Sequence, residues 1–442
     1  MNHPMDRFQQ DSYRADDVRA ITRHLTESGT FQFPTLPNGL FSAAIAHSED
    51  QEYTGYQNVW VRDNIHIAHQ FHVLGQHAAA VAVVSAITKF LHTQRNKLRD
   101  IITGKADPRD VMRRPHIRFD GAKLVELPEK WAHAQNDAIG YWLWLSSKLA
   151  QAGHWQPTGD DIKLFSNFVE YLAAIRFWED EDSGHWEEAR KVEASSVGVA
   201  TAGLTAVRDY FVTMASAQMP LGATKSFVDQ TCRRAETLIE HGRAALQAIL
   251  PSECVQDDPA KRRRYDAALL FLIYPVRIVT DEQADVIVSD VAEHLQGPHG
   301  IRRYLGDSYW CANYKALLDP ANRTADVSDD MTARDRLLQP GGEAQWCIFD
   351  PILSVIHGQR FQSTGDPERL RLQTQHLNRS LRQLTGEGTL FPPLRCPESY
   401  YLENDRWGPN DITPLLWTQA NLRLALHVME QSLLVGVGCG SA

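Results

Sequence analysis

The segment "GYQNVWVRDNIHIAHQF", residues 55–71, places Arg62 and Asp63 directly after the apolar and aromatic run Val59-Trp60-Val61. Apolar residues then recur at helical spacing, which predicts that the charged pair lies at the start of a helix. Such a pair either forms a local ion pair that closes the helix start, or faces a bound polar ligand. The rest of the chain has to separate these two interpretations.

Helical spacing recurs along the chain, and few segments alternate as a strand does. The loops between these segments are long and rich in Gly, Pro, Asp and aromatic residues, whereas helix connections in a bundle usually have about two to eight residues. Long loops of this kind often build a site. We therefore predict an all-α toroid of paired helices with its active site at one end. The expected helices are residues 17–27, 64–74, 78–91, 135–149, 162–177, 195–215, 225–250, 267–274, 284–295, 343–356, 367–384 and 413–434.

The charge pattern argues against a general polyanion binder. The 442 residues carry a formal net charge of −10, and the acidic residues are spread along the chain. The one dense basic run, residues 261–264, precedes an apolar stretch and is predicted to be a solvated helix start rather than a nucleic-acid contact.

The sequence also predicts a cytoplasmic protein without a membrane partner. No stretch is apolar over the 18 or more residues that a membrane span needs, and the polar first residues lack the apolar core of a signal peptide. The six cysteines are far apart and show no C-x-x-C spacing, which fits a reducing compartment.

The loop "FWEDEDSGHWEEARKVEASS", residues 177–196, contains the first candidate catalytic carboxyl group. Glu187 follows Trp186, and a carboxyl group beside an indole is partly desolvated, which raises its pKa toward that of a general acid. The alternative is that Trp186 belongs to the core and that Glu187 and Glu188 are exposed. The acidic residues 179–182 are predicted to be solvated.

A second candidate carboxyl group lies in "RCPESYYLENDRWGPND", residues 395–411. Glu398 is followed by Tyr400 and Tyr401, an aromatic setting that suits stacking on a sugar ring. Glycoside cleavage needs two carboxyl groups at one scissile bond, and Glu187 and Glu398 qualify by environment. Apolar faces for carbohydrate are expected from tryptophans 60, 131, 186, 310, 346, 407 and 417, although these can also be core residues.

Other chemistries have little support in the sequence. There is no G-x-S-x-G, no H-E-x-x-H, no P-loop and no dinucleotide-binding glycine pattern. His66, His69 and His72 recur every third residue, but without a neighbouring carboxylate or cysteine we interpret them as polar packing rather than as metal ligands. The sequence therefore predicts no metal site and no cofactor.

Six motifs in a fixed order, which together span about residues 40–430, resemble glycoside hydrolase family 15, the glucoamylase-like enzymes. The similarity is strongest to the branch that includes the glucoamylase-like domain of phosphorylase kinase regulatory subunits. The motifs are "VWVRDN" (59–64), "KWAHAQNDAIGY" (130–141), "GHWEEARKVEASSVGVATAGLTAV" (184–207), "RRYLGDSYW" (302–310), "EAQWCIFDPIL" (343–353) and "PESYY...PNDITPLLWTQANL" (397–422).

The resemblance implies an (α/α)6 barrel and assigns roles to individual residues. Glu187 matches the general acid, Glu188 a neighbouring substrate-binding glutamate, and Glu398 the general base that activates water. Arg62 and Asp63 match the pair that binds the terminal glucose. Further substrate contacts are expected from Trp60, Trp131, Gln135, Asp137, Trp186, Trp346, Tyr400 and either Arg302 or Arg303.

We accordingly expect an exo-acting, inverting hydrolase that releases glucose from the non-reducing end of small soluble α-1,4- or α-1,6-gluco-oligosaccharides. The alternative is a non-catalytic glucan-sensing or regulatory protein related to phosphorylase kinase regulatory subunits. We expect a monomer or homodimer with an oligosaccharide substrate. Residues 1–40 are expected to pack on the barrel, 41–434 to form the catalytic domain, and 435–442 to be a flexible tail.

Overall fold

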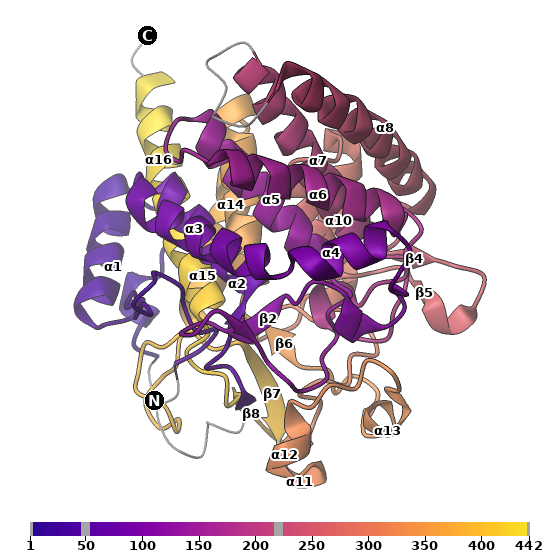
Figure 1. Cartoon of the computed structure of the whole chain (residues 1–442). Coiled ribbons are helices and arrows are strands. Elements are labelled where there is room, and N and C mark those ends of the chain that lie inside the picture. Colours follow the sequence, from indigo (N-terminus) through magenta and orange to yellow (C-terminus); the bar gives the residue numbers. More distant parts are fainter. Residues whose placement is uncertain (1–2, 46–53, 216–223, 440–442) are drawn as a thin grey trace.

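Twelve helices form two concentric rings in the computed structural model, which describes residues 3–45, 54–215 and 224–439 apart from the side chains of 436–439. In the inner ring each helix packs against the next, and α16 returns to α2 and closes the circle (Figure 1). The inner helices are α2 (Val61–Val73), α5 (Asn136–Gln151), α7 (Ala194–Ala215), α9 (Leu270–Ile273), α14 (Phe349–Thr364) and α16 (Leu416–Cys439).

Each inner helix is preceded in the chain by one outer helix. This arrangement of six helical hairpins is the (α/α)6 barrel, so the predicted fold is confirmed. The outer helices are α1 (Ala15–Glu27), α3 (His77–Thr93), α6 (Gly159–Ala174), α8 (Lys225–Ile249), α10 (Asp281–Asp290) and α15 (Pro367–Arg382). A further helix, α4 (Arg95–Ile102), was not predicted and follows α3.

The two rings differ in how their surfaces are buried. Every residue of α5 from Asn136 to Ser147 is buried, because this inner helix is covered on all sides. The outer helix α15 buries only one stripe, including Leu377 and Leu381, and its remaining surface is largely polar. α9 is only one turn long and continues a 3-10 turn at Ala267–Leu269, so the inner ring is shortest there.

Short strands and three short helices gather at one end of the barrel (Figure 1). Two three-stranded antiparallel sheets lie there, with the orders β1-β2-β3 and β6-β7-β8. The strands are β1 (Val59–Trp60), β2 (Arg118–Asp120), β3 (Val125–Glu126), β6 (Gln345–Trp346), β7 (Ser399–Glu403) and β8 (Arg406–Pro409), and the helices are α11 (Tyr314–Leu317), α12 (Pro320–Arg323) and α13 (Thr332–Asp335).

Three local predictions are wrong. The helix expected over 343–356 begins only at Phe349, because Gln345 and Trp346 pair with β7 instead. The basic run 261–264 is not a helix start: Arg262–Arg263 form β5, which pairs with β4 (Cys254–Val255), and the Arg263 side chain, 10% exposed, pairs with Glu188 and Asp266. Asp182, expected to be solvated, is buried and accepts a hydrogen bond from the backbone of Asn136.

The ends of the predicted catalytic domain lie against or within helices of the barrel. In the segment 1–40, α1 packs against α16. The boundary expected at residue 434 lies inside α16, which continues to Cys439, and residues 440–442 lie outside the described chain. Within the described residues, no helix combines the length and apolar character needed to cross a membrane.

Two glycines allow α5 and α7 to approach closely. A Cβ atom at Gly203 would lie 2.5 Å from the carbonyl oxygen of Gly140, and one at Gly140 would lie 2.6 Å from the carbonyl oxygen of Val199. Both obstacles are backbone atoms, so side-chain rotation cannot relieve them. The contact between these inner helices therefore requires glycine at both positions.

We expect Gly203→Ala to lower the free energy of unfolding by about 1–3 kcal/mol, because the added methyl group overpacks a helix interface. Urea unfolding followed by circular dichroism measures this loss. Gly408→Ala in β8 is the matched control, since a Cβ there meets no atom within 4 Å. Equal stability of the two variants would contradict the close contact.

Candidate active site

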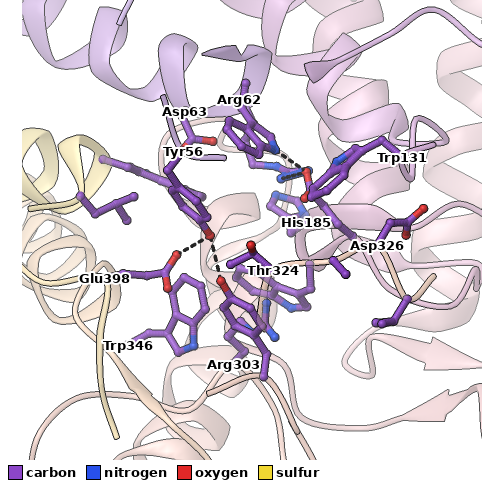
Figure 2. A pocket seen from close by; sticks show the side chains of 18 of the residues that line it. Tyr56, Arg62, Asp63, Trp131, His185, Arg303, Thr324, Asp326, Trp346 and Glu398 are labelled. Carbon is purple, nitrogen blue, oxygen red and sulfur yellow. Dashed lines mark hydrogen bonds and ion pairs between the residues drawn. The ribbon is translucent and has the colours of Figure 1, made fainter. Parts of the chain in front are cut away.

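A pocket opens at the end of the barrel where the short strands gather, and most of the predicted site residues line it (Figure 2). Asp63 and Trp417 come from the inner helices α2 and α16, whereas Trp60 and Trp346 come from the strands β1 and β6. The predicted residues that line the pocket are Trp60, Arg62, Asp63, Trp131, Trp186, Glu187, Arg303, Trp346 and Glu398.

Glu398 lies on one wall of this pocket, and both of its carboxylate oxygens are hydrogen-bonded (Figure 2). The Tyr56 hydroxyl donates to Oε1 over 2.8 Å, and the Asn410 amide donates to Oε2 over 2.6 Å. Burial raises the pKa of Glu398 to about 7, and these two hydrogen bonds oppose that rise. The carboxyl group is thus held in one orientation and titrates near neutral pH.

Glu187 lies in the same pocket, directly after the 3-10 turn Gly184–Trp186. Its backbone is left-handed, with φ 59°, a conformation that is uncommon for a residue with a side chain. The Trp60 indole and the Gln135 amide both donate to its Oε1, over 2.8 and 3.0 Å. Burial raises the pKa of Glu187, the direction that the sequence predicts for a carboxyl group beside an indole.

Arg62 does not form its ion pair with Asp63. Its Nε donates to Asp137 over 2.6 Å, and its terminal nitrogen donates to Gln135 and to the carbonyl oxygen of Gly184. The guanidinium therefore links the starts of α2 and α5 to the turn that presents Glu187. Gln135 and Asp137 lie behind the pocket lining, where they bind Arg62.

Asp63 does line the pocket (Figure 2). Burial is the main reason that its pKa is raised to about 7, and the nearby positive charge of Arg62 opposes this. Both residues of the opening pair therefore line the pocket, and Arg62 also forms an ion pair within the fold, with Asp137.

Of the two candidate arginines, only Arg303 lines the pocket, whereas Arg302 lies 3.5 Å from Glu343. Arg303 donates two hydrogen bonds to Asp307, and its guanidinium carbon lies 4.8 Å from the centre of the Trp346 ring. The sequence left the choice between the two arginines open, and their positions distinguish them.

Glu188 and Tyr400 do not line the pocket. Glu188 is 1% exposed and pairs with Arg263 at 2.8 Å and with Arg303 at 3.6 Å. Burial alone would raise its pKa, but these two positive charges hold it below its ordinary value. The Tyr400 hydroxyl donates to the carbonyl oxygen of Gln383, so it points into the protein.

Several residues around the pocket were missed. Tyr56 and Tyr309, whose hydroxyl groups lie 3.1 Å apart, and Asn410 all belong to quoted motifs, but their spacing gives no sign of contact with Glu398. Segments 313–340 contribute Asp326 and Arg334 to the lining. Only the three-dimensional arrangement of the loops identifies these residues.

The histidines of α2 divide into two groups. His66 stacks on Trp417 with ring centres 4.4 Å apart, and His69 shares a hydrogen bond of 2.8 Å with the Tyr274 hydroxyl. His66 and His69 thus pack inside the barrel, as the sequence predicted for them. His72 instead contacts His77.

The (α/α)6 barrel of this chain is the fold of solved glycosidases and glucoamylases, and the aromatic pocket at one end of it contains Glu187 and the buried Glu398. The family described as Glycosyl hydrolases family 15 matches residues 26–307, more than half of the chain. The chain belongs to this family.

Proteins similar in sequence include regulatory subunits of phosphorylase b kinase. The chain is 24% identical over 416 residues to the probable phosphorylase b kinase regulatory subunit alpha of Caenorhabditis elegans, covering 84% of this chain and 30% of that protein. The liver isoform of this subunit from Oryctolagus cuniculus is 28% identical over 338 residues, with 73% and 25% covered. The chain thus spans less than a third of the length of these relatives.

Solved structures with the same fold are glycosidases. A wild-type glycosidase aligns with a TM-score of 0.63 and 19% identity, covering 94% of this chain and 97% of the other. A bacterial glucoamylase complexed with acarbose aligns with a TM-score of 0.57 and 13% identity, covering 90% and 53%. At these identities the comparison establishes the fold.

We expect Tyr56→Phe to raise the pKa of Glu398 above about 7, because the lost hydrogen bond stabilises the ionised carboxylate. A hydrogen bond to a charged group of this strength corresponds to a shift of about one pH unit. A 13C-NMR titration of the glutamate carboxyl carbons, with Glu398→Gln for assignment, measures it. Tyr13→Phe, whose hydroxyl binds Asn378 far along the chain, should leave the titration unchanged. An unaltered Glu398 titration in Tyr56→Phe would contradict the contact.

Proposed function

We propose that the protein is an exo-acting, inverting hydrolase that releases glucose from the non-reducing end of small soluble α-gluco-oligosaccharides. The observation that carries this proposal is that Glu187 and Glu398 line one pocket and that burial raises the pKa of both. Glycoside hydrolysis requires two carboxyl groups at one scissile bond.

In the proposed reaction Glu187 is the general acid. Its Oε1 accepts hydrogen bonds from Trp60 and Gln135, and we assign the transferred proton to Oε2. The raised pKa keeps that proton in place until the glycosidic oxygen takes it, as the bond from C1 of the sugar to this oxygen breaks.

Glu398 is the general base in this reaction. It takes a proton from a water molecule while the water oxygen forms the new bond to C1 on the face opposite the leaving group, so the configuration inverts. Tyr56 and Asn410 orient the carboxylate and favour its ionised form. With a pKa of about 7, the base is active in its ionised state above neutral pH and loses activity as the pH falls.

Recognition of a terminal glucose is assigned to the polar groups of the pocket. Asp63 and Arg303 face the pocket beside the flat faces of Trp346 and Trp131, a combination that suits a sugar with polar edges and apolar faces. A sugar that lacks one of the glucose hydroxyl groups would leave a buried polar group of the pocket without its hydrogen bond. The pocket would therefore discriminate against such sugars. The similarity to a bacterial glucoamylase whose structure contains acarbose supports a glucan-like substrate.

We assign the choice between α-1,4 and α-1,6 bonds to the part of the pocket that would bind the second sugar of the oligosaccharide. Asp326 and Arg334, from the segment of short helices, contribute to the lining from outside the helical barrel. Lys130 pairs with Asp329 and lies 3.6 Å from Asp326, which ties this segment to the loop before Trp131. Such a wall leaves room for short oligosaccharides, and we expect higher kcat/KM for them than for polymer.

The alternative function is a non-catalytic, glucan-sensing role, which the similarity to phosphorylase b kinase regulatory subunits favours. A sensor needs contacts to sugar but neither a proton donor nor a base. The presence of both Glu187 and Glu398 in one pocket therefore favours the enzyme.

The test is a substrate panel of maltose to maltoheptaose, isomaltose, panose, soluble starch and dextran. We expect wild-type protein to release glucose, and Glu187→Gln and Glu398→Gln to lower kcat by a factor of about 100 or more, because each amide keeps the shape but cannot transfer the proton. NMR of the first-formed sugar should show β-glucose. α-Glucose would contradict inversion, and no glucose from any substrate, with sugar binding retained, would favour the sensor.

The neighbouring arginines provide a matched pair of variants. We expect Arg303→Lys to lower kcat/KM by about 10- to 100-fold, because a lysine cannot hold Asp307 with two donors and face the pocket together. Arg302→Lys, which keeps a positive charge near Glu343 outside the pocket, should change kcat/KM by less than about twofold. The opposite ranking would assign sugar recognition to Arg302.

A further inference from the structure

Three histidines meet at the end of the barrel opposite the pocket. His72 lies in the last turn of α2, His77 begins α3, and His154 follows the end of α5. His72 is ten residues beyond Arg62 on the same helix, which places it about 15 Å farther along the axis. This group is therefore separate from the proposed catalytic site.

The nitrogens of these rings are close enough to share a ligand. The Nδ1 atoms of His72 and His77 are 3.0 Å apart, and one nitrogen of each of the three rings lies within 4.8 Å of the others. Two nitrogens bound to one tetrahedral Zn²⁺ are about 3.4 Å apart, given Zn–N bonds of about 2.0–2.1 Å. The His72–His77 pair is already near that separation.

The third ring has the freedom to complete the arrangement. His77 and His154 stack with ring centres 3.7 Å apart and 15° between the ring planes, which brings His154 beside the pair with its ring nearly parallel to that of His77. His154 is exposed, whereas His72 and His77 are half-buried. Rotation of this one exposed side chain is sufficient to turn its nitrogen toward the other two.

We propose that His72, His77 and His154 bind one divalent transition-metal ion, Zn²⁺ or Ni²⁺, which connects the α2–α3 turn to the end of α5. Three imidazoles without a carboxylate favour such ions, whereas Mg²⁺ and Ca²⁺ require oxygen ligands. A fourth position on the exposed side of His154 is left for water. Among the described residues, this is the one place where three potential ligands of this kind lie so close together.

Isothermal titration of the metal-free protein with ZnCl₂ and NiCl₂ tests the site. We expect one ion per chain, and a loss of affinity of at least about tenfold in each of His72→Ala, His77→Ala and His154→Ala. Binding to the native state alone should also raise Tm, by an amount that grows with the logarithm of the ion concentration above Kd, and this rise should disappear in the variants. His154→Ala is the decisive variant, because an exposed side chain can be removed without disturbing the fold.

His427→Ala is the control, because His427 is a half-buried histidine of α16 that shares a hydrogen bond with Gln431 and does not belong to the three-histidine group, and this variant should bind the ion as wild type does. Two results would overturn the proposal. Unchanged affinity in the His154 variant would assign any bound ion to other groups, such as the cysteines. If wild-type protein bound neither Zn²⁺ nor Ni²⁺, His72 and His77 would be a hydrogen-bonded pair with no metal-binding role. Neither result bears on glucoside hydrolysis, which is measured at the other end of the barrel.

Discussion

The buried guanidinium of Arg62 connects the barrel to its candidate active site. It lies at the start of α2, binds Asp137 and Gln135 at the start of α5, and donates to the carbonyl oxygen of Gly184. A buried charge is stable only when its donors are satisfied, so these partners have little freedom to move apart. The position of Glu187, three residues after Gly184, therefore depends on the packing of two inner helices.

The two candidate catalytic carboxyl groups are held by different means. Glu187 depends on a turn that Arg62 fixes, and its hydrogen bonds converge on one oxygen. Glu398 extends from the loop before β7, and each of its oxygens has its own donor. Two donors on Oε1 of Glu187 are compatible with a proton on Oε2, whereas donors on both oxygens of Glu398 fix its orientation and favour the ionised form that removes a proton from water. This asymmetry gives a structural reason for the proposed assignment of acid and base.

The helices could be predicted from the sequence because burial of an apolar face repeats with the helical period, as in α1, α3 and α8. α4 was missed and the start of α14 was misplaced, since strand pairing of Gln345 and Trp346 depends on residues 399 and 400, far along the chain. Within the site, Glu187 and Glu398 could be proposed from their aromatic neighbours. The contacts of Tyr56 and Asn410, and the ion pair of Arg263 with Glu188, arise from loops that meet only in the folded protein, and no local pattern encodes them.

The left-handed backbone at Glu187 has an evolutionary consequence. Residues with side chains are uncommon in this conformation, which costs of order 1 kcal/mol or more, whereas glycine adopts it freely. Selection for thermal stability alone would therefore favour glycine or asparagine at this position, at the expense of the carboxyl group. In a lineage that no longer needs the reaction, a single substitution of Glu187 by glycine or asparagine would increase stability. On the proposed assignment of Glu187 as the acid, the residue found at position 187 in a relative thus indicates whether that relative has retained the reaction.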